Sequence, residues 1–175
     1  MCKQFAAGER VVYGKMGVCL VTDRQVMAFG GEREEYYILQ PQRDPRSSIY
    51  VPCGNALLMA KLRPLLSKEE IDTILQGVPQ EDIGWIDDKN ERSTQFRRIL
   101  AQDDRRQLLR LIRCLMSEKR RRIAAGKKLP AADEATLQEG VHLVEQEFSQ
   151  VLNIPAAQVN EYIRARIEEA AAQPE

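Results

Sequence analysis

The sequence contains little of what metal sites and covalent frameworks need: among its 175 residues are one histidine and four cysteines. The cysteines are scattered, and none forms a CxxC pair: Cys2, Cys19, Cys53 and Cys114. Structural zinc sites use closely spaced cysteine and histidine ligands, and disulfide frameworks are typical of small secreted chains. We therefore expect reduced thiols, no metal site and no cofactor.

Catalytic motifs are also missing. The sequence has neither a glycine-rich phosphate-binding loop nor a G-x-S-x-G nucleophile elbow. Its one histidine, His142, lies in the helical pattern LQEGVHLVEQEF and is expected to point away from the apolar stripe of that helix. The acidic pairs are neighbours in sequence, and each pair suits a turn or a helix cap. We expect no catalytic residues, no enzyme activity and no small-molecule substrate.

Long apolar runs are absent as well. Runs such as NALLMA are far shorter than the ~18 residues of a membrane-spanning helix, and MCKQFAAGER has no apolar segment of signal-peptide length. With 43% hydrophobic and 30% charged residues, the composition is that of a folded globular chain. We expect a cytoplasmic protein without a membrane partner.

The first 53 residues have the pattern of short strands. ERVVY, GVCLVT, EEYYILQ and SSIYVP are rich in β-branched and aromatic residues, and turns that contain glycine or proline separate them. Four to five strands in about 50 residues are typical of a small, strongly bent barrel or sheet. We predict an SH3/Tudor-like β-barrel in residues 1–66.

The rest of the chain has a helical pattern, which predicts an all-α domain of four or five helices in residues 67–175 and an α+β protein. Ser67 and Glu70 form a capping box before the first of these helices, and Gly77 and Pro79 are expected to end it. Further helix starts are indicated at Ser93, at Asp103 or Asp104, at Pro130 and at Pro155.

The net charge of zero hides one strongly basic block. Residues 89–128 hold 14 Lys or Arg and 4 Asp or Glu, whereas the neighbouring segments, 67–88 and 129–175, are acidic. On the helix expected after Asp104, leucines share one face and arginines the opposite one. These arginines are Arg106, Arg110, Arg113, Arg120 and Arg121. Two interpretations remain open, a surface that binds a polyanion and an ordinary solvated helix face.

The only tryptophan, Trp85, lies in the polar connection that GWIDDKNERSTQFRRIL begins. From the residues alone, the favoured role is a hydrophobic plug of the helical domain, flanked by Ile83 and Ile86. The other role is an exposed ring that a partner contacts.

Several stretches resemble the CarD family of bacterial transcription regulators. They are FAAGERVVYGKMGVCLV, YYILQ, IYVPCGNALLMAKLRPLLSKEEIDTIL, the tryptophan and RSTQFRRILAQDD. The most specific parts are Gly8 with Val11-Val12-Tyr13 and Gly17, Val51-Pro52 with Asn55-Ala56, and Leu62-Arg63-Pro64-Leu65. The resemblance extends over nearly the whole chain.

The resemblance implies a protein of two parts. The N-terminal Tudor-like domain, which transcription-repair coupling factors share, docks on the RNA polymerase β subunit. The helical domain lies on promoter DNA at the upstream edge of the melted bubble, where a tryptophan enters the minor groove and holds the open complex. By matching position that tryptophan is Trp85. An aromatic wedge is physically reasonable at a base step that the polymerase has already begun to unstack.

The expected DNA contacts are Trp85 and seven cations near it or on the arginine face. The cations are Lys89, Arg92, Arg97, Arg98, Arg106, Arg110 and Arg113. Four acidic residues beside the ring argue against tight phosphate contact there: Glu81, Asp82, Asp87 and Asp88. Two hypotheses account for them, a weak and largely non-sequence-specific DNA affinity, or pairing with the arginines in the free protein.

The expected polymerase contact is the strand SSIYVP, which as a sheet edge could pair with a strand of the β subunit. Its residues are Ser48, Ile49, Tyr50, Val51 and Pro52. Alternatively, Ile49 and Val51 are buried and Tyr50 is an ordinary surface aromatic. Two other functions remain open, a protein-interaction adaptor that does not bind DNA and an RNA- or ribosome-associated factor, since arginine-rich helices also suit RNA.

Overall fold

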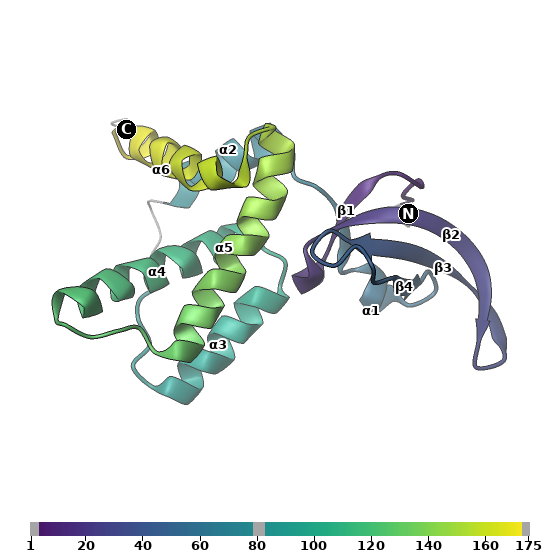
Figure 1. Cartoon of the computed structure of the whole chain (residues 1–175), viewed down its shortest axis with the longest axis horizontal. Coiled ribbons are helices and arrows are strands. Elements are labelled where there is room, and N and C mark those ends of the chain that lie inside the picture. The colour runs from purple at the N-terminus through teal and green to yellow at the C-terminus, as the bar shows by residue number, and fades with distance from the viewer. Residues whose placement is uncertain (1–3, 79–82, 173–175) are drawn as a thin grey trace. The chain divides into compact units, whose positions relative to one another are not determined.

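The computed structural model describes residues 4–78 and 83–172. The chain divides into two compact units, Met1–Leu65 and Leu66–Glu175, one residue before the predicted boundary. The first unit is an antiparallel sheet with one short helix, and the second consists of helices (Figure 1). The predicted α+β class is therefore found.

The N-terminal unit contains five antiparallel strands in the order β4-β3-β2-β1-β5. The strands are β1 (Arg10–Tyr13), β2 (Val18–Phe29), β3 (Glu32–Pro41), β4 (Ile49–Pro52) and β5 (Leu62–Pro64). A 3-10 turn, η1 (Gly14–Met16), links β1 to β2, and the short helix α1 (Ala56–Met59) precedes β5. β2 and β3 form a long, curved hairpin (Figure 1).

A closed barrel, as predicted from the sequence, is not seen. β4 pairs with β3 and β5 pairs with β1, so these two short strands lie at opposite ends of the strand order. The sheet bends at a register shift between Val21 and Asp23, where a bulge increases the local twist. β5 was not predicted, because three residues are too few to show an alternating pattern.

The core of this unit forms on one face of the bent sheet. Val11, Val21 and Leu39 are fully buried, and Phe5 packs edge-to-face on Tyr37 with ring centroids 6.0 Å apart. The Tyr37 hydroxyl accepts a hydrogen bond from the Phe5 backbone amide at 3.1 Å. Because strand residues alternate between faces, the opposite face of β3 and β4 is left for other contacts.

The helical unit contains α2 (Lys68–Gly77), α3 (Lys89–Ala101), α4 (Arg105–Ala124), α5 (Ala131–Leu152) and α6 (Ala156–Ala172). The predicted capping box of Ser67 and Glu70 starts α2, and the Asp104 carboxylate caps α4. Pro79, expected to help end α2, lies outside the described residues. α3 starts at Lys89, four residues before the start predicted at Ser93. The Asp88 carboxylate accepts a hydrogen bond from the Glu91 backbone amide and caps the helix at this point.

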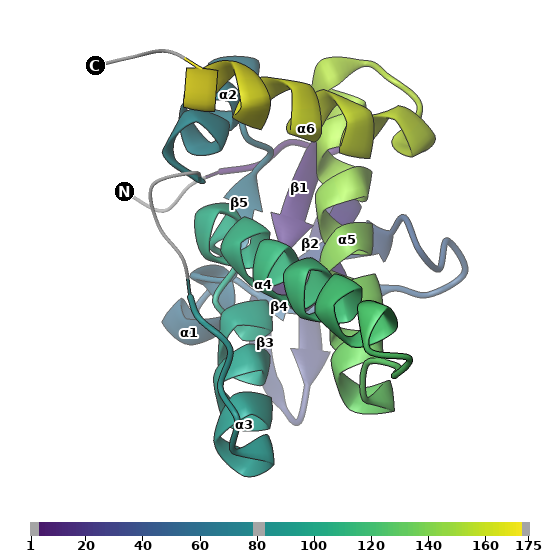
Figure 2. The same ribbon diagram turned by 90° about the vertical axis from the view of Figure 1, so that its left-hand side faces the viewer.

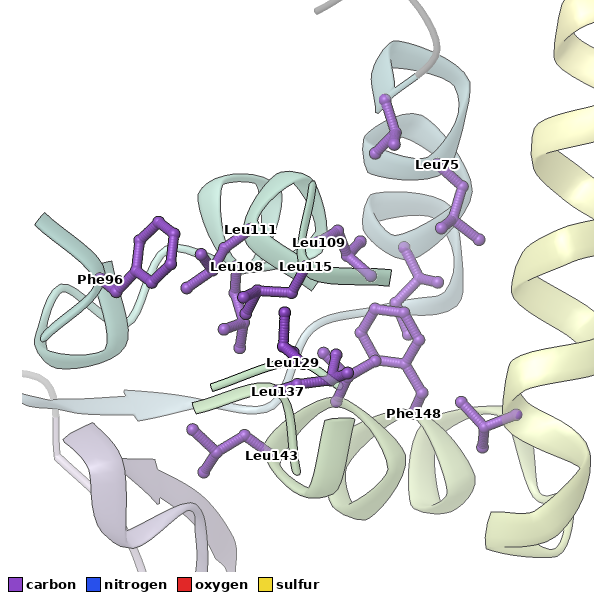
Figure 3. Packing of buried hydrophobic residues seen from close by; sticks show 14 residues of the cluster. Leu75, Phe96, Leu108, Leu109, Leu111, Leu115, Leu129, Leu137, Leu143 and Phe148 are labelled. Carbon is purple, nitrogen blue, oxygen red and sulfur yellow. The ribbon is translucent and has the colours of Figure 1, made fainter. Parts of the chain in front are cut away.

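α5 is the centre of the helical unit, since α2, α3, α4 and α6 all pack against it (Figure 2). Figure 3 shows the core between them, with Leu75 from α2, Phe96 from α3, Leu108 and Leu115 from α4, and Phe148 from α5. Each such side chain contributes about 1.5–3 kcal/mol when it is fully buried. This core holds α3, α4 and α5 in place around the connection that carries Trp85.

A buried carboxylate also joins the helices. Glu147 of α5 is fully buried; one of its oxygens accepts from Arg105 Nε at 2.7 Å and the other from the Leu66 backbone amide at 3.0 Å. Arg105, itself buried at the start of α4, also pairs with Asp103 at 3.2 Å. The network attaches the first residue of the unit and the start of α4 to α5.

We expect Glu147→Ala to lower the free energy of unfolding of the helical unit by about 3–5 kcal/mol, because it leaves a buried guanidinium without its main partner. Denaturant unfolding followed by circular dichroism measures this. Glu161→Ala, at an exposed position of α6, is the control and should change stability by less than about 0.5 kcal/mol. Equal stabilities of the two variants would contradict this role of Glu147.

Candidate functional site

Trp85 lies in the connection before α3, and its ring is half-buried. It packs edge-to-face on Phe96, with ring centroids 6.3 Å apart and planes at 62°. Gly84 before it has φ +69°, a backbone conformation that favours glycine, and its carbonyl accepts from the Cys114 thiol at 3.4 Å. The connection is thus attached to both α3 and α4.

Two guanidinium groups lie over the indole. The Arg92 Cζ atom is 4.4 Å from the ring centroid and the Arg122 Cζ atom 5.6 Å, both within the range of cation–π attraction. Each arginine comes from a different helix, α3 or α4. The indole is therefore braced by charge as well as by apolar packing.

Arg92 is 6% exposed, and its donors are used inside the unit. Its Nε and Nη2 atoms donate to the Asp133 carboxylate of α5 at 3.2 and 3.0 Å. Its Nη1 donates to the carbonyls of Ile86 and Asp87, at 2.8 and 3.1 Å. Arg92 therefore fixes the connection directly after Trp85.

Arg122 is held by Glu118, one turn earlier on α4. The Glu118 carboxylate accepts from Arg121 at 2.7 Å and from Arg122 at 2.6 Å, although its side chain is only 5% exposed. Hydrogen bonds from Arg121 and then Arg122 lower the pKa of Glu118 from its ordinary value of 4.5 to about 2. We refer to Trp85, Arg92, Arg122, Glu118 and Asp133 as the tryptophan cluster.

The cluster corrects the predicted DNA-contacting set. Arg92 was expected to face phosphates, but its buried ion pair with Asp133 makes it a structural brace. Trp85 was expected to be either an exposed ring or a plug, and its half-buried position combines features of both. The acids that pair with the two arginines over the indole are Asp133 for Arg92 and Glu118 for Arg122.

Of the predicted acidic quartet beside the ring, Asp87 interacts electrostatically with Arg121 and adds to the Glu118 hydrogen bond in raising the pKa of that arginine. The Asp88 carboxylate caps α3, and the Asp87 carbonyl accepts from Arg92. Glu81 and Asp82 lie outside the described residues.

The cations of α3 and α4 differ in their surroundings. On α3, Lys89 and Arg98 are exposed without an acidic partner among the residues that the structure describes, and Arg97 donates only to the Ser93 hydroxyl at 2.8 Å. These three keep the accessibility that DNA contact requires.

The three α4 arginines of the predicted DNA-contacting set lie against other parts of the helical unit or are partly buried in it. Arg113 donates to the Val78 carbonyl at 3.0 Å, and the Arg106 guanidinium lies so close to Gly77 that an added Cβ there would come within 2.9 Å of it. Arg110 is half-buried. This part of the expected arginine face thus packs in part on the end of α2.

The predicted polymerase-binding strand is β4, which lies at an edge of the sheet. Ser48 precedes it and is exposed, Tyr50 is 44% exposed, and Ile49 and Pro52 are half-buried. Val51 is fully buried, so its side chain belongs to the core and only its backbone could meet a partner. Burial of Val51 is compatible with the predicted backbone pairing at this edge, and Ser48 and Tyr50 keep exposed side chains.

An aromatic group beside β4 was not predicted. Phe29, at the end of β2, packs edge-to-face on Tyr36 at 5.2 Å and on Tyr50 at 5.8 Å between centroids. Burial and the neighbouring Glu34 carboxylate raise the pKa of Tyr36. We refer to Phe29, Tyr36 and Tyr50 as the aromatic trio. Alternation in EEYYILQ places Tyr36 on one face, but no local pattern shows that the curved hairpin brings Phe29 to it.

Among residues 4–78 and 83–172, no group of three or more His, Cys, Asp or Glu side chains is placed to hold a metal ion. None of the helices in these ranges is both long enough and apolar enough to cross a membrane.

Comparison with known families identifies the N-terminal unit. Residues 5–65 match the CarD-like/TRCF RID domain, in which TRCF is transcription-repair coupling factor and RID is the RNA polymerase-interacting domain. The resemblance to the CarD family is confirmed for the N-terminal unit, which carries a CarD-like/TRCF RID domain. A domain of this family implies an RNA polymerase partner and a role in transcription regulation. Comparison with curated proteins gave no match.

Because Trp85 is the only tryptophan, its fluorescence reports on the cluster alone. We expect Arg122→Ala to increase acrylamide quenching about 1.5- to 2-fold, since it removes one of the two groups over the ring. Arg120→Ala, at an exposed position of the same helix, should leave quenching unchanged. Equal quenching in the two variants would show that Arg122 does not cover the indole.

The lowered pKa of Glu118 predicts a pH dependence of stability. A carboxyl group with a depressed folded-state pKa stabilises the fold above its ordinary pKa, and this contribution is lost as the pH falls. We expect Glu118→Gln to lower the free energy of unfolding by roughly 1 kcal/mol at neutral pH, because the exposed Arg121 is screened by solvent. The difference from the wild type should shrink as pH falls from about 5 towards about 2.

Denaturant unfolding at several pH values measures this difference, with Glu161→Gln, on exposed α6 surface, as the control. A difference that stays constant over the acidic range would contradict the assignment.

Proposed function

We propose that this protein is a non-enzymatic bacterial transcription regulator that docks on the β subunit of RNA polymerase and stabilises the promoter open complex. The N-terminal unit makes the polymerase contact, and the helical unit meets DNA at the upstream edge of the bubble. The observation that carries the proposal is the match of residues 5–65 to the CarD-like/TRCF RID domain. A cytoplasmic location belongs to the same proposal, since bacterial polymerase works there.

The edge strand β4 supports the polymerase contact. A strand of the β subunit that adds to this edge would gain backbone hydrogen bonds, while side chains beside the edge select the partner. Tyr50 of β4 is 44% exposed, and the aromatic trio places Phe29, which is 55% exposed, beside it. Exposed aromatic side chains of this kind are common anchors in protein interfaces.

Trp85 and the α3 cations support the DNA contact. The indole packs on Phe96, which fixes the orientation of the ring, and the Trp85 side chain remains partly exposed to solvent. Lys89, Arg97 and Arg98 are available for phosphates on the helix that follows. With few free cations the intrinsic DNA affinity is weak, and tethering to polymerase supplies a high effective DNA concentration.

One observation favours the alternative of an adaptor that does not bind DNA. Several arginines of the basic block are occupied inside the helical unit, by Asp133, by Glu118 and by the Val78 carbonyl. On this alternative the positive block stabilises the fold, and the helical unit binds another protein. A promoter footprint of the polymerase complex, with and without the protein, separates the two functions.

We expect Trp85→Ala to shorten the lifetime of a promoter open complex about fivefold, as loss of about 1 kcal/mol of base–aromatic contact would do. Competitor-challenged dissociation of polymerase holoenzyme from promoter DNA measures the lifetime. Co-purification with polymerase should be unaffected, because the N-terminal unit is unchanged.

Phe96→Leu is the matched control, because it weakens the packing under the indole and leaves the indole itself in place. If both variants shorten the lifetime equally and are equally destabilised, Trp85 acts as a plug and the DNA contact is refuted. If neither variant co-purifies with polymerase, the docking part of the proposal fails instead.

A further inference from the structure

A groove crosses the helical unit, and its lining residues differ from those of the tryptophan cluster. Its volume is about 530 Å³, and its walls are α4 and α6, which both pack across α5 (Figure 2). The floor is apolar and is formed mainly by Ile112, Met116, Val141, Val144, Ile163 and Ile167. Met116 is 39% exposed, and with the other floor residues it forms a contiguous apolar surface, which is the kind that marks interaction sites.

The groove is long rather than round. Its α4 wall extends from Leu109 to Arg120, about 16 Å at 1.5 Å per residue, and its α6 wall from Asn160 to Glu168, about 12 Å. On both helices the lining residues recur at three- and four-residue spacing, so each wall is one continuous helix face. A trough of this length suits about three turns of a guest helix.

The rim of the groove is positive. Arg113 and Arg120 from α4 and Arg164 from α6 line it, opposed by Glu168. Arg120 and Arg164 are exposed and have no acidic partner within the described part of the chain. The occupant therefore needs an apolar face for the floor and carboxylates for the rim. Duplex DNA has no comparable apolar surface to cover the floor.

We propose that this groove binds an acidic amphipathic helix of a partner protein. Apolar side chains at i, i+3 or i+4 and i+7 of that helix cover the floor, as in other helix-in-groove complexes. Flanking carboxylates pair with Arg120 and Arg164. The site goes beyond the proposed function, because neither polymerase docking nor the DNA contact of Trp85 and the α3 cations involves it.

The test uses the purified full-length chain without polymerase or DNA, so that its outcome is independent of the proposed function. The probe is a fluorescein-labelled peptide of about three helical turns, with leucines on one face and glutamates beside them. The matched peptide carries lysine in place of every glutamate. Fluorescence anisotropy should show micromolar binding of the acidic peptide and at least tenfold weaker binding of the basic one.

The variants separate the groove from overall charge. Arg120→Glu combined with Arg164→Glu should weaken binding of the acidic peptide at least tenfold. Lys127→Glu combined with Lys128→Glu makes the same change of charge outside the groove and should leave binding unchanged. Circular dichroism checks that both variants are folded, and Met116→Glu, which changes only the floor, should also weaken binding.

The proposal is overturned if the acidic peptide does not bind, or if both double variants lose affinity for the peptide equally. It is also overturned if the groove variant loses affinity for a DNA duplex instead of the peptide. Sedimentation equilibrium gives the remaining outcome: self-association that Arg120→Glu with Arg164→Glu abolishes would assign the groove to a second copy of the chain.

Discussion

The buried ion pair of Arg92 and Asp133 holds the candidate DNA site together. Both side chains are almost fully buried, so neither charge would be tolerated alone, and breaking such a pair costs about 3–5 kcal/mol. The pair joins α3 to α5, and the remaining Arg92 donors hold the carbonyls of Ile86 and Asp87 beside Trp85. The same guanidinium lies 4.4 Å from the indole centroid. The position of the ring thus depends on a contact made by another helix.

Positive charge has two uses in this helical unit. Arg92, Arg105 and Arg122 are paired with acids and position helices or the indole. Lys89, Arg97 and Arg98 lie at the surface, where a polyanion could reach them. A basic block of residues is therefore a poor measure of DNA affinity, because structural pairing removes part of its charge from the surface. Weak intrinsic affinity is consistent with a factor that polymerase brings to the promoter.

Features encoded by neighbouring residues could be predicted from the sequence. The capping box at Ser67, the Asp104 cap and the helices after Pro130 and Pro155 all depend on local chemistry. The tryptophan cluster could be predicted only in part. Glu118 stands three and four residues before its arginines, but Arg92 and Asp133 are 41 residues apart and meet only through packing of α3 on α5. The aromatic trio likewise depends on the curvature of the β2–β3 hairpin.

The central claim is that one braced, half-buried indole meets promoter DNA. The most direct measurement is ¹⁹F NMR of protein that contains 5-fluorotryptophan, which labels Trp85 alone. The account predicts that the ¹⁹F chemical shift changes when the protein joins a polymerase–promoter open complex. When only polymerase is added, the shift should stay at the value of the free protein. An identical ¹⁹F environment with and without promoter DNA would show that Trp85 is a structural residue and contradict the account.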